Sequence, residues 1–200
     1  MKVTPVEYTL DALSYRGVRS SGVHLTDCLD YLERKILRKP AQDFSEWESS
    51  AELGFAWEDL VIRSLEAQGA VIVKGVEVSS DGIAMSPDII EIGSGFQSLP
   101  AVPLAEGDIR VWDTKLKWAS ILNAPPEGNW RWQYQLKCYC RAIGASVAVI
   151  APYYINGKWR PPAPIKAFQV WEFTARELDE TWRSVVQARG ALVREEKSEG

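Results

Sequence analysis

The segment from Ile109 to Trp118 constrains the fold more than any other, because it carries opposite charges inside an apolar run. Its first four residues, Ile-Arg-Val-Trp, lead directly into Asp113-Thr114-Lys115. Side chains of a β-strand alternate between its two faces, so Asp113 and Lys115 are expected to point the same way. A carboxylate and an ammonium group on one face can hold a metal ion and steer a water molecule. The segment therefore predicts a sheet with a chemical site at its surface.

A second carboxylate, Asp88, follows Pro87 in another strand-like run that continues to Ile92. Two carboxylates and a lysine at the edge of a sheet can build a Mg²⁺ site for phosphodiester hydrolysis, because Mg²⁺ prefers oxygen ligands. The alternative is a turn residue at Asp88 and an exposed strand carboxylate at Asp113, and a D-x-K match on its own favours that alternative. The site therefore depends on further elements in the sequence.

Two helical segments supply those elements, one on each side of the strand. Gly54 to Glu58 forms G-x-x-x-E upstream, and Gln135 to Tyr139 forms Q-x-x-x-Y downstream. With Asp88 and the D-x-K, this ordered set resembles the PD-(D/E)XK nucleases. Within them it is most similar to the RecB-like branch, which includes phage recombination exonucleases. The resemblance runs from Gly54 to Tyr139 and continues to about Arg183.

The resemblance implies a role for each residue of the acidic set. Asp88, Asp113 and the carbonyl of Thr114 would hold Mg²⁺ or Mn²⁺, and Lys115 would orient or deprotonate the attacking water. Glu58 would bind a second metal ion or orient groups around the first, although a surface glutamate on a helix is the alternative. Glu is more usual than Asp at the position of Asp113 in this branch, so the metal ion would lie closer to the strand here.

A helix predicted from Trp130 to Ile143 places Gln135 and Tyr139 on one face, because they are four residues apart. By the resemblance, Gln135 would bond near the lysine or the water, and Tyr139 would position the DNA backbone. Trp132 and Leu136 belong to an apolar stripe that also includes Tyr139. A position in the core is therefore the alternative for this tyrosine.

A basic window overlaps the strand and this helix. Between Ile109 and Gly144, six basic residues accompany two acidic ones, a local charge of +4 on a chain with a net charge of −4. A basic surface on an acidic body can hold phosphate groups, and a solvated face without a partner is the alternative. The candidate contacts to nucleic acid are Lys117, Arg131, Lys137, Tyr139 and Arg141.

The cysteines and the single histidine narrow the chemistry further. Cys28, Cys138 and Cys140 give no disulfide framework. Cys138 and Cys140 would point about 200° apart on a regular helix, so they could not chelate one ion. The iron–sulfur nucleases of the RecB-like branch carry three cysteines beyond the Q-x-x-x-Y, and this sequence has none after Cys140, so we expect no iron–sulfur cluster. His24 lies far from the motifs, which argues against histidine-based chemistry.

The order of predicted elements indicates an α/β fold with a mixed central sheet flanked by helices, a restriction-endonuclease-like core. We expect one nuclease-like domain over residues 1–200, with an N-terminal arm at 1–23 and a frayed tail at 194–200. The loop from Gly93 to Gly107 is expected to close over the site as a lid. Further expected features are a helix capped by Thr26 or Asp27, capping boxes at Ser45 and Thr174, a strand from Val71 to Val78, and a hairpin turn at Asn156-Gly157.

Together these features predict a metal-dependent DNA nuclease, an exonuclease of phage or mobile-element recombination or DNA processing. A catalytically inactive protein of the same fold that binds nucleic acid or a protein partner is one alternative, and a structure-specific endonuclease is another. The lid and the basic window opposite it are expected to form a channel that favours linear DNA with a free end. The resemblance implies a ring-like homo-oligomer and a single-strand annealing or recombination partner. The sequence contains no membrane-spanning run and no signal core, so we expect a cytoplasmic protein.

Overall fold

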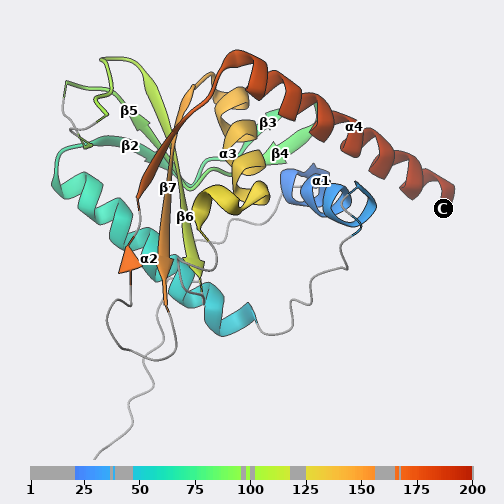
Figure 1. Cartoon of the computed structure of the whole chain (residues 1–200), viewed down its shortest axis with the longest axis horizontal. Helices are drawn as coiled ribbons and strands as arrows, with labels where there is room; N and C mark the ends of the chain where they lie inside the picture. The colour runs from blue at the N-terminus through green and yellow to red at the C-terminus, as the bar shows by residue number, and fades with distance from the viewer. Residues whose placement is uncertain are drawn as a thin grey trace, which may run out of the picture.

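The computed structural model describes residues 21–36, 38, 47–95, 98–99, 102–117, 125–155, 165–166 and 168–199. Figure 1 shows the arrangement of its helices and strands. In chain order they are β1 (Val23–His24), α1 (Leu25–Tyr31), the π-helical turn η2 (Leu32–Ile36), α2 (Trp47–Ala67), β2 (Val71–Lys74), β3 (Val78–Ser80), β4 (Ile83–Met85), β5 (Ile89–Ile92), β6 (Ile109–Lys117), the 3-10 turn η3 (Pro126–Gly128), α3 (Trp130–Ile143), β7 (Val147–Tyr154), β8 (Ile165–Lys166), β9 (Gln169–Glu172) and α4 (Ala175–Glu199).

The central sheet is mixed, with strand order β2-β5-β6-β7-β8 and β9 also paired with β7. Strands β6 and β7 are parallel, and the other pairs are antiparallel. Pairing between β5 and β6 stops where Ile89 meets Trp112, whereas β6 stays paired with β7 as far as Lys117. One edge of the last part of β6 therefore extends beyond its neighbour β5.

Each face of this sheet is covered by different helices, and each forms a separate hydrophobic core with them (Figure 1). On one face, α2 packs against Trp112, Ile89 and Val149. On the other face, α1, α3 and α4 pack around Val111 and Ile150. Neighbouring residues of one strand thus enter different cores, as alternation requires. The expected α/β fold with a mixed central sheet between helices is confirmed.

A second, three-stranded sheet in the order β1-β4-β3 joins the core that contains α1, α3 and α4. Its hairpin turns at Asp81 and Gly82, whose φ angles of 49° and 70° are those of a tight two-residue turn. The expected single strand from Val71 to Val78 is wrong, because β2 pairs with β5 and β3 pairs with β4. Alternation alone did not show that the chain changes sheets at Gly75, where φ is 66°.

The ends of the helices follow local chemistry. Asn129 caps α3 by accepting hydrogen bonds from two backbone N–H groups, and Gly144 ends it with φ of 80°. The helix predicted from Trp130 to Ile143 is confirmed. The capping box at Thr174 is confirmed, since Glu177 accepts from its backbone and hydroxyl. The cap of α1 is His24, with Asp27 at the third helical position, so the predicted cap is wrong by two or three residues.

Helix α4 continues to Glu199, where a frayed tail from residue 194 was expected. The N-terminal arm was expected at residues 1–23, but Val23 already belongs to β1. Residues 1–20, the Ser45 capping residue and the Asn156-Gly157 turn lie outside the described residues. In the described part of the chain, every helix is too short or too polar to cross a lipid bilayer.

The loop between β5 and β6 does not lie where a lid would. It leaves β5 after Ile92, which pairs with Ile109 at the start of β6. Asp88 and Asp113 lie at the opposite end of β5, because the two strands are antiparallel. The expected lid over these carboxylates is therefore wrong, since a hairpin loop lies at the far end from the residue that precedes its first strand.

Candidate active site

The candidate site forms where β6 continues past the start of β5. Asp88, just before β5, accepts a hydrogen bond from the Thr114 backbone N–H at 2.6 Å and another from the Thr114 hydroxyl at 2.8 Å. A side-chain oxygen thus occupies the place where the next strand residue would have paired. The N–H and C=O groups of one strand residue point to the same side, so the Thr114 carbonyl is directed to that open edge.

Asp113 and Lys115 share a face, as the alternation predicts. Lys115 Nζ lies 2.6 Å from Oδ2 of Asp113, an ion-pair distance without the geometry of a directed hydrogen bond. Asp113 is 0% exposed, and among the described residues its Oδ1 has no hydrogen-bond partner. A buried carboxylate oxygen without a partner is costly, so this position is prepared for a further group.

Carboxylates outnumber cations around this position. Burial, together with the charges of Asp88 and Asp113, raises the pKa of Glu58 to about 7, and Lys115 partly opposes this shift. Burial also raises the pKa of Asp113 to about 7, with Asp88 adding to the shift and Lys115 opposing it. Glu58 comes from α2 and Asp88 from the start of β5, so two elements bring negative charge to Asp113.

The lysine keeps its proton in this surrounding. Burial lowers the pKa of Lys115, but the charges of Asp113, Asp88 and Glu58 more than compensate and hold it above its ordinary value. Its side chain is 21% exposed, so the ammonium group remains accessible from solvent. The arrangement can therefore present a positive charge next to an under-neutralised acidic pair.

Helix α3 lies behind the acidic pair. Gln135 Nε2 donates to the Tyr139 hydroxyl at 2.7 Å, so the two predicted motif residues bond to each other. Tyr139 is 4% exposed, and burial with the charges of Asp113 and Asp88 holds its pKa well above its ordinary value. This burial favours the core alternative for Tyr139, and its contact with DNA stays a prediction.

Two arginines of the basic window are already paired. Arg131 lies 2.7 Å from Asp30 and 3.2 Å from Glu33, both in the α1–η2 segment. Arg141 lies 2.7 Å from Asp179 on α4. Their expected role as contacts to nucleic acid is weakened, because carboxylates from outside the window neutralise them.

The two lysines of the window that were expected to contact nucleic acid lie over aromatic rings. Lys117 Nζ is 5.8 Å from the centre of the Trp132 ring, on the face of β6 that carries Asp113. Lys137 Nζ is 5.5 Å from the centre of the Phe173 ring. These lysines keep their charge available for an anion, and Lys117 is the nearer to the candidate site along the strand.

The oxygen donors at the site are Asp88, Asp113, Glu58 and the Thr114 carbonyl. Within the described ranges, no three His, Cys, Asp or Glu side chains are grouped so that they could hold a metal ion by themselves. The described cysteines are buried thiols, and burial raises the pKa of Cys28 and Cys140 to about 12. The Thr114 hydroxyl, which the sequence analysis did not identify, also positions Asp88. The only hint of it in the sequence is that the middle residue of the D-x-K is polar.

Comparison with known proteins supports the fold. No protein-family model and no curated protein matches the chain. A phage-related exonuclease from Haemophilus somnus 129PT is 13% identical and superposes with a TM-score of 0.51 over 98% of this chain and 91% of that one. LHK-Exo, an alkaline exonuclease from Laribacter hongkongensis, is 11% identical in its complex with dAMP. It superposes with a TM-score of 0.53 over 87% of this chain and 89% of that one. At such identities the likeness shows a shared fold.

Proposed function

We propose that the protein is a metal-dependent deoxyribonuclease that hydrolyses phosphodiester bonds at the Asp88, Asp113 and Lys115 site. One observation carries this proposal: Asp113 is fully buried, and its Oδ1 has no hydrogen-bond partner among the described residues, while Lys115 lies beside its other oxygen. A structural ion pair would be expected to satisfy both oxygens. A buried carboxylate oxygen without a partner, next to two further carboxylates, is a suitable ligand for a cation.

The donor set fits Mg²⁺ or Mn²⁺. Mg²⁺ is commonly held by one or two carboxylates, with waters and substrate phosphates as the remaining ligands, so a cage of three acidic side chains is unnecessary. Asp88, Asp113 and the Thr114 carbonyl would hold the ion, and Glu58 would hold a second ion or orient its water. When bound, the ion would polarise the phosphate and lower the pKa of a water.

The residues around the ion have separable tasks. Because its pKa is raised, Lys115 remains an ammonium group, so it orients the attacking water and offsets developing negative charge. Glu58, with a pKa of about 7, is suited to exchange a proton with that water near neutral pH. Gln135 donates to the Tyr139 hydroxyl and thereby orients that hydroxyl on α3 beside Asp88 and Asp113.

DNA with a free end is the proposed substrate. The two similar structures are named as exonucleases, and one of them holds dAMP, a deoxynucleotide. An exonuclease acting in phage or mobile-element recombination, assembled as a ring and working with a single-strand annealing or recombination partner, is the specific form of this proposal. Lys117 would contact the phosphate backbone next to the site.

The deciding experiment uses matched linear and covalently closed duplexes with Mg²⁺, Mn²⁺ or EDTA. We expect cleavage of linear DNA with either ion, none in EDTA, and a loss of at least about 10² in Lys115→Ala. Lys74→Ala is the control, because Lys74 pairs with Glu66 on the surface. Cleavage that survives EDTA would overturn the metal mechanism, and equal cutting of both forms would favour an endonuclease. Binding without any cleavage would favour the inactive alternative.

A further inference from the structure

A groove of about 340 Å³ runs along α2 on the sheet face opposite Lys115. Its floor is aromatic. Trp57 donates its indole N–H to the Ala151 carbonyl at 2.7 Å, and Trp112 donates its own to Glu91 at 2.8 Å. These two bonds fix both indoles, so the groove has a rigid apolar wall and does not need to reorganise to receive a flat ligand.

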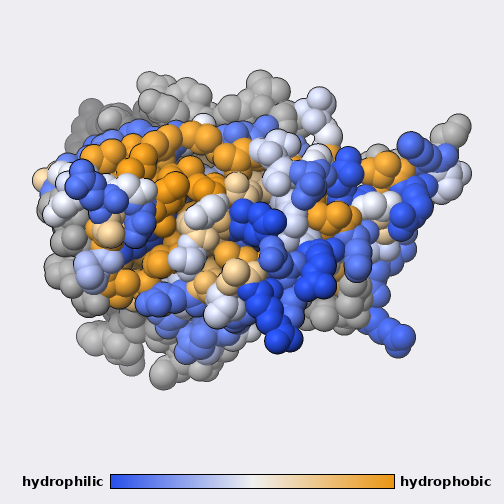
Figure 2. Space-filling model, turned by 90° about the horizontal axis from the view of Figure 1, so that it is seen from above, coloured by the Kyte–Doolittle hydropathy of each residue, from blue (hydrophilic) through white to orange (hydrophobic). Residues whose placement is uncertain are grey.

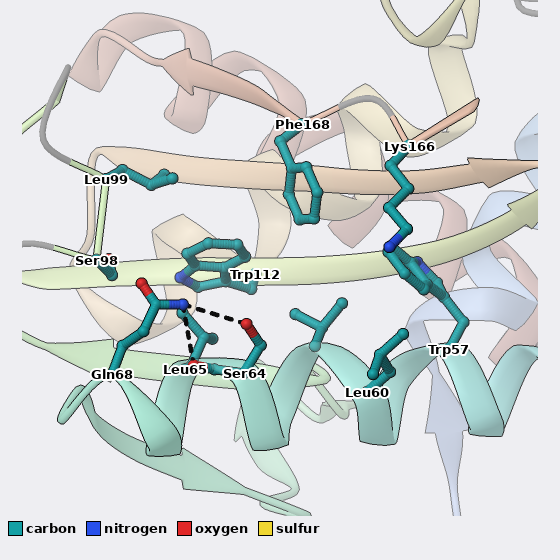
Figure 3. A pocket seen from close by; sticks show the side chains of 11 residues that line it. Trp57, Leu60, Ser64, Leu65, Gln68, Ser98, Leu99, Trp112, Lys166 and Phe168 are labelled. Atoms are coloured by element: carbon teal, nitrogen blue, oxygen red, sulfur yellow. Dashed lines mark hydrogen bonds between the residues drawn. The ribbon is translucent and has the colours of Figure 1, made fainter.

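The mouth of the groove is formed by apolar side chains that solvent still reaches. Leu60 on α2 is 51% exposed, and Phe168, just before β9, is 46% exposed. The Phe168 ring centre lies 6.0 Å from that of Trp57 and 6.3 Å from that of Trp112. Figure 3 shows Phe168 reaching from the strand side toward α2. A ligand that covered Phe168 and Leu60 would bury apolar surface that is now wet.

One end of the groove is cationic. Lys166 Nζ lies 5.8 Å from the centre of the Trp57 ring, as Figure 3 shows, and no described carboxylate pairs with it. On α2, Asp59 pairs with Arg63 and Glu66 with Lys74, whereas Glu58 belongs to the acidic site with Asp88 and Asp113. Lys166 therefore leaves a net positive charge at this end, which an anionic group could neutralise.

The other end is polar, with Ser64 in the last turn of α2 and Gln68 just after the helix. Gln68 donates from Nε2 to the backbone oxygen and hydroxyl of Ser64, at 3.0 and 3.1 Å. That arrangement aims its amide along the groove wall (Figure 3). The amide oxygen of Gln68 and the Ser64 hydroxyl can meet the hydrogen-bonding edge of a planar ring.

Apolar side chains also gather into one hollowed area on the part of the molecule away from the C-terminal end of α4 (Figure 2). The exposed large apolar residues of the described chain are Leu53, Leu60, Val71, Val73 and Phe168. Only Leu60 and Phe168 among them line the groove. Leu53, Val71 and Val73 are exposed to a similar extent but lie outside the groove.

We propose that this groove binds an unpaired nucleotide of a DNA strand, with its base against Phe168 and Leu60 and its phosphate at Lys166. This inference rests on the proposed function for the choice of DNA. Trp57 adjoins Glu58 in the chain, so the groove starts next to the candidate active site. A strand that passes the acidic pair could place an unpaired base in the groove between α2 and the opposite face of the sheet. An apolar peptide would leave Lys166 without a counter-charge.

The test measures the binding of a labelled single-stranded oligonucleotide by fluorescence anisotropy in EDTA, where no cleavage takes place. A second oligonucleotide of equal length carries abasic sites. We expect wild-type protein to bind the abasic strand at least about tenfold more weakly, and Phe168→Ala to lose about tenfold on the normal strand only. Lys166→Gln should weaken binding to both strands and reduce its salt dependence by about one phosphate contact.

Val71→Ala is the control, because Val71 is also 46% exposed and lies on β2 outside the groove. It should bind as wild type does. Should Phe168→Ala unfold, Leu60→Ser provides the same test. Equal binding of normal and abasic strands by wild type would overturn the proposal, as would a Phe168→Ala result matching the control. A changed oligomeric state in Phe168→Ala with normal DNA binding would assign the groove to a protein contact instead. Absent cleavage with Mg²⁺ would reject the nuclease and leave the base-binding result standing.

Discussion

Asp88 takes the place of a strand residue for Thr114, whose N–H and hydroxyl both donate to the same carboxylate oxygen at 2.6 and 2.8 Å. These bonds close the edge of β6 at the position where β5 no longer covers it. They also hold one acidic side chain next to the fully buried Asp113. The geometry of the proposed metal site therefore depends on a residue that the D-x-K pattern leaves unspecified.

We expect Thr114→Val to weaken the response to Mg²⁺ by about tenfold, because it removes a hydrogen bond that orients the ligand Asp88. Thr114→Ser keeps that bond and should restore the wild-type response. Two measurements separate orientation from general damage: the Mg²⁺ concentration for half-maximal cleavage, and Ca²⁺ binding by calorimetry. A valine variant with wild-type values in both would show that Asp88 needs no support from the hydroxyl.

Asp113 should make the metal-free protein less stable as the pH rises. Its pKa is raised to about 7 in the folded protein, so the folded state favours the protonated form. The resulting stabilisation is fully present below the ordinary pKa of the unfolded chain and is lost as pH rises through about 7. Lys115 stays protonated throughout this range.

Asp113→Asn removes this titration. Relative to wild type, its Tm should therefore rise by at least about 3 °C more at pH 8 than at pH 4, the shift that roughly 1 kcal/mol produces in a domain of this size. Thermal unfolding in EDTA at both pH values measures the difference. Any constant effect of leaving Lys115 without its partner cancels in that comparison. If the Tm difference between Asp113→Asn and wild type were the same at both pH values, Asp113 would ionise in the folded protein without loss of stability.

The basic window illustrates a limit of reasoning from local charge. Its count of +4 includes Arg110, which is 1% exposed and lies 3.5 Å from Glu91. It also includes Arg131 and Arg141, whose acidic partners lie in segments far away in the sequence. A count along the chain cannot include partners that only the fold brings close.

By contrast, the alternation rule correctly predicted the relative position of two side chains. It placed Asp113 and Lys115 on one face, and the structure brings them to 2.6 Å. It could not show the depth of burial, since the same pattern describes an exposed strand. Helix spacing likewise put Gln135 and Tyr139 on one side, but the choice between core and substrate contact for Tyr139 depends on which elements pack there. The antiparallel pairing of β5 with β6 decided the location of the Gly93 to Gly107 loop, and which strands pair is not visible in the sequence.

A divalent cation should stabilise the folded protein at the acidic site. Saturating Mg²⁺ or Mn²⁺ at pH 8 should raise the Tm of wild type by several degrees, since a ligand that binds only the native state adds stability by mass action. The double variant Asp88→Asn with Asp113→Asn should show no such rise. Glu66→Gln, which alters an exposed ion pair with Lys74, serves as control. Equal shifts in all three proteins would place the cation elsewhere.

Lys117 and Arg141 should differ in their effect on DNA binding. Arg141 is 48% exposed but lies 2.7 Å from Asp179, so Arg141→Gln should leave affinity within about twofold of wild type. Lys117 lies over Trp132 beside the site, so Lys117→Gln should weaken binding and lower the salt dependence by about one phosphate contact. Binding to a short duplex with Ca²⁺ at several salt concentrations measures both. The opposite ranking would show that the surface near α4 contacts DNA.

Tyr139→Phe separates the two interpretations of the Q-x-x-x-Y helix. The Tyr139 side chain is 4% exposed, and its hydroxyl accepts a hydrogen bond from Gln135 at 2.7 Å. Removing the hydroxyl should therefore lower the free energy of unfolding by about 1 kcal/mol, the usual net value of one such bond, and leave DNA affinity unchanged. Urea unfolding and duplex binding with Ca²⁺ measure the two quantities.

Gln135→Ala should lower the free energy of unfolding by a similar amount. Combining both changes should lower it by less than the sum of the two, because they remove the same bond. A tenfold loss of DNA affinity in Tyr139→Phe at full stability would instead mean that the tyrosine reaches the substrate after a rearrangement of α3.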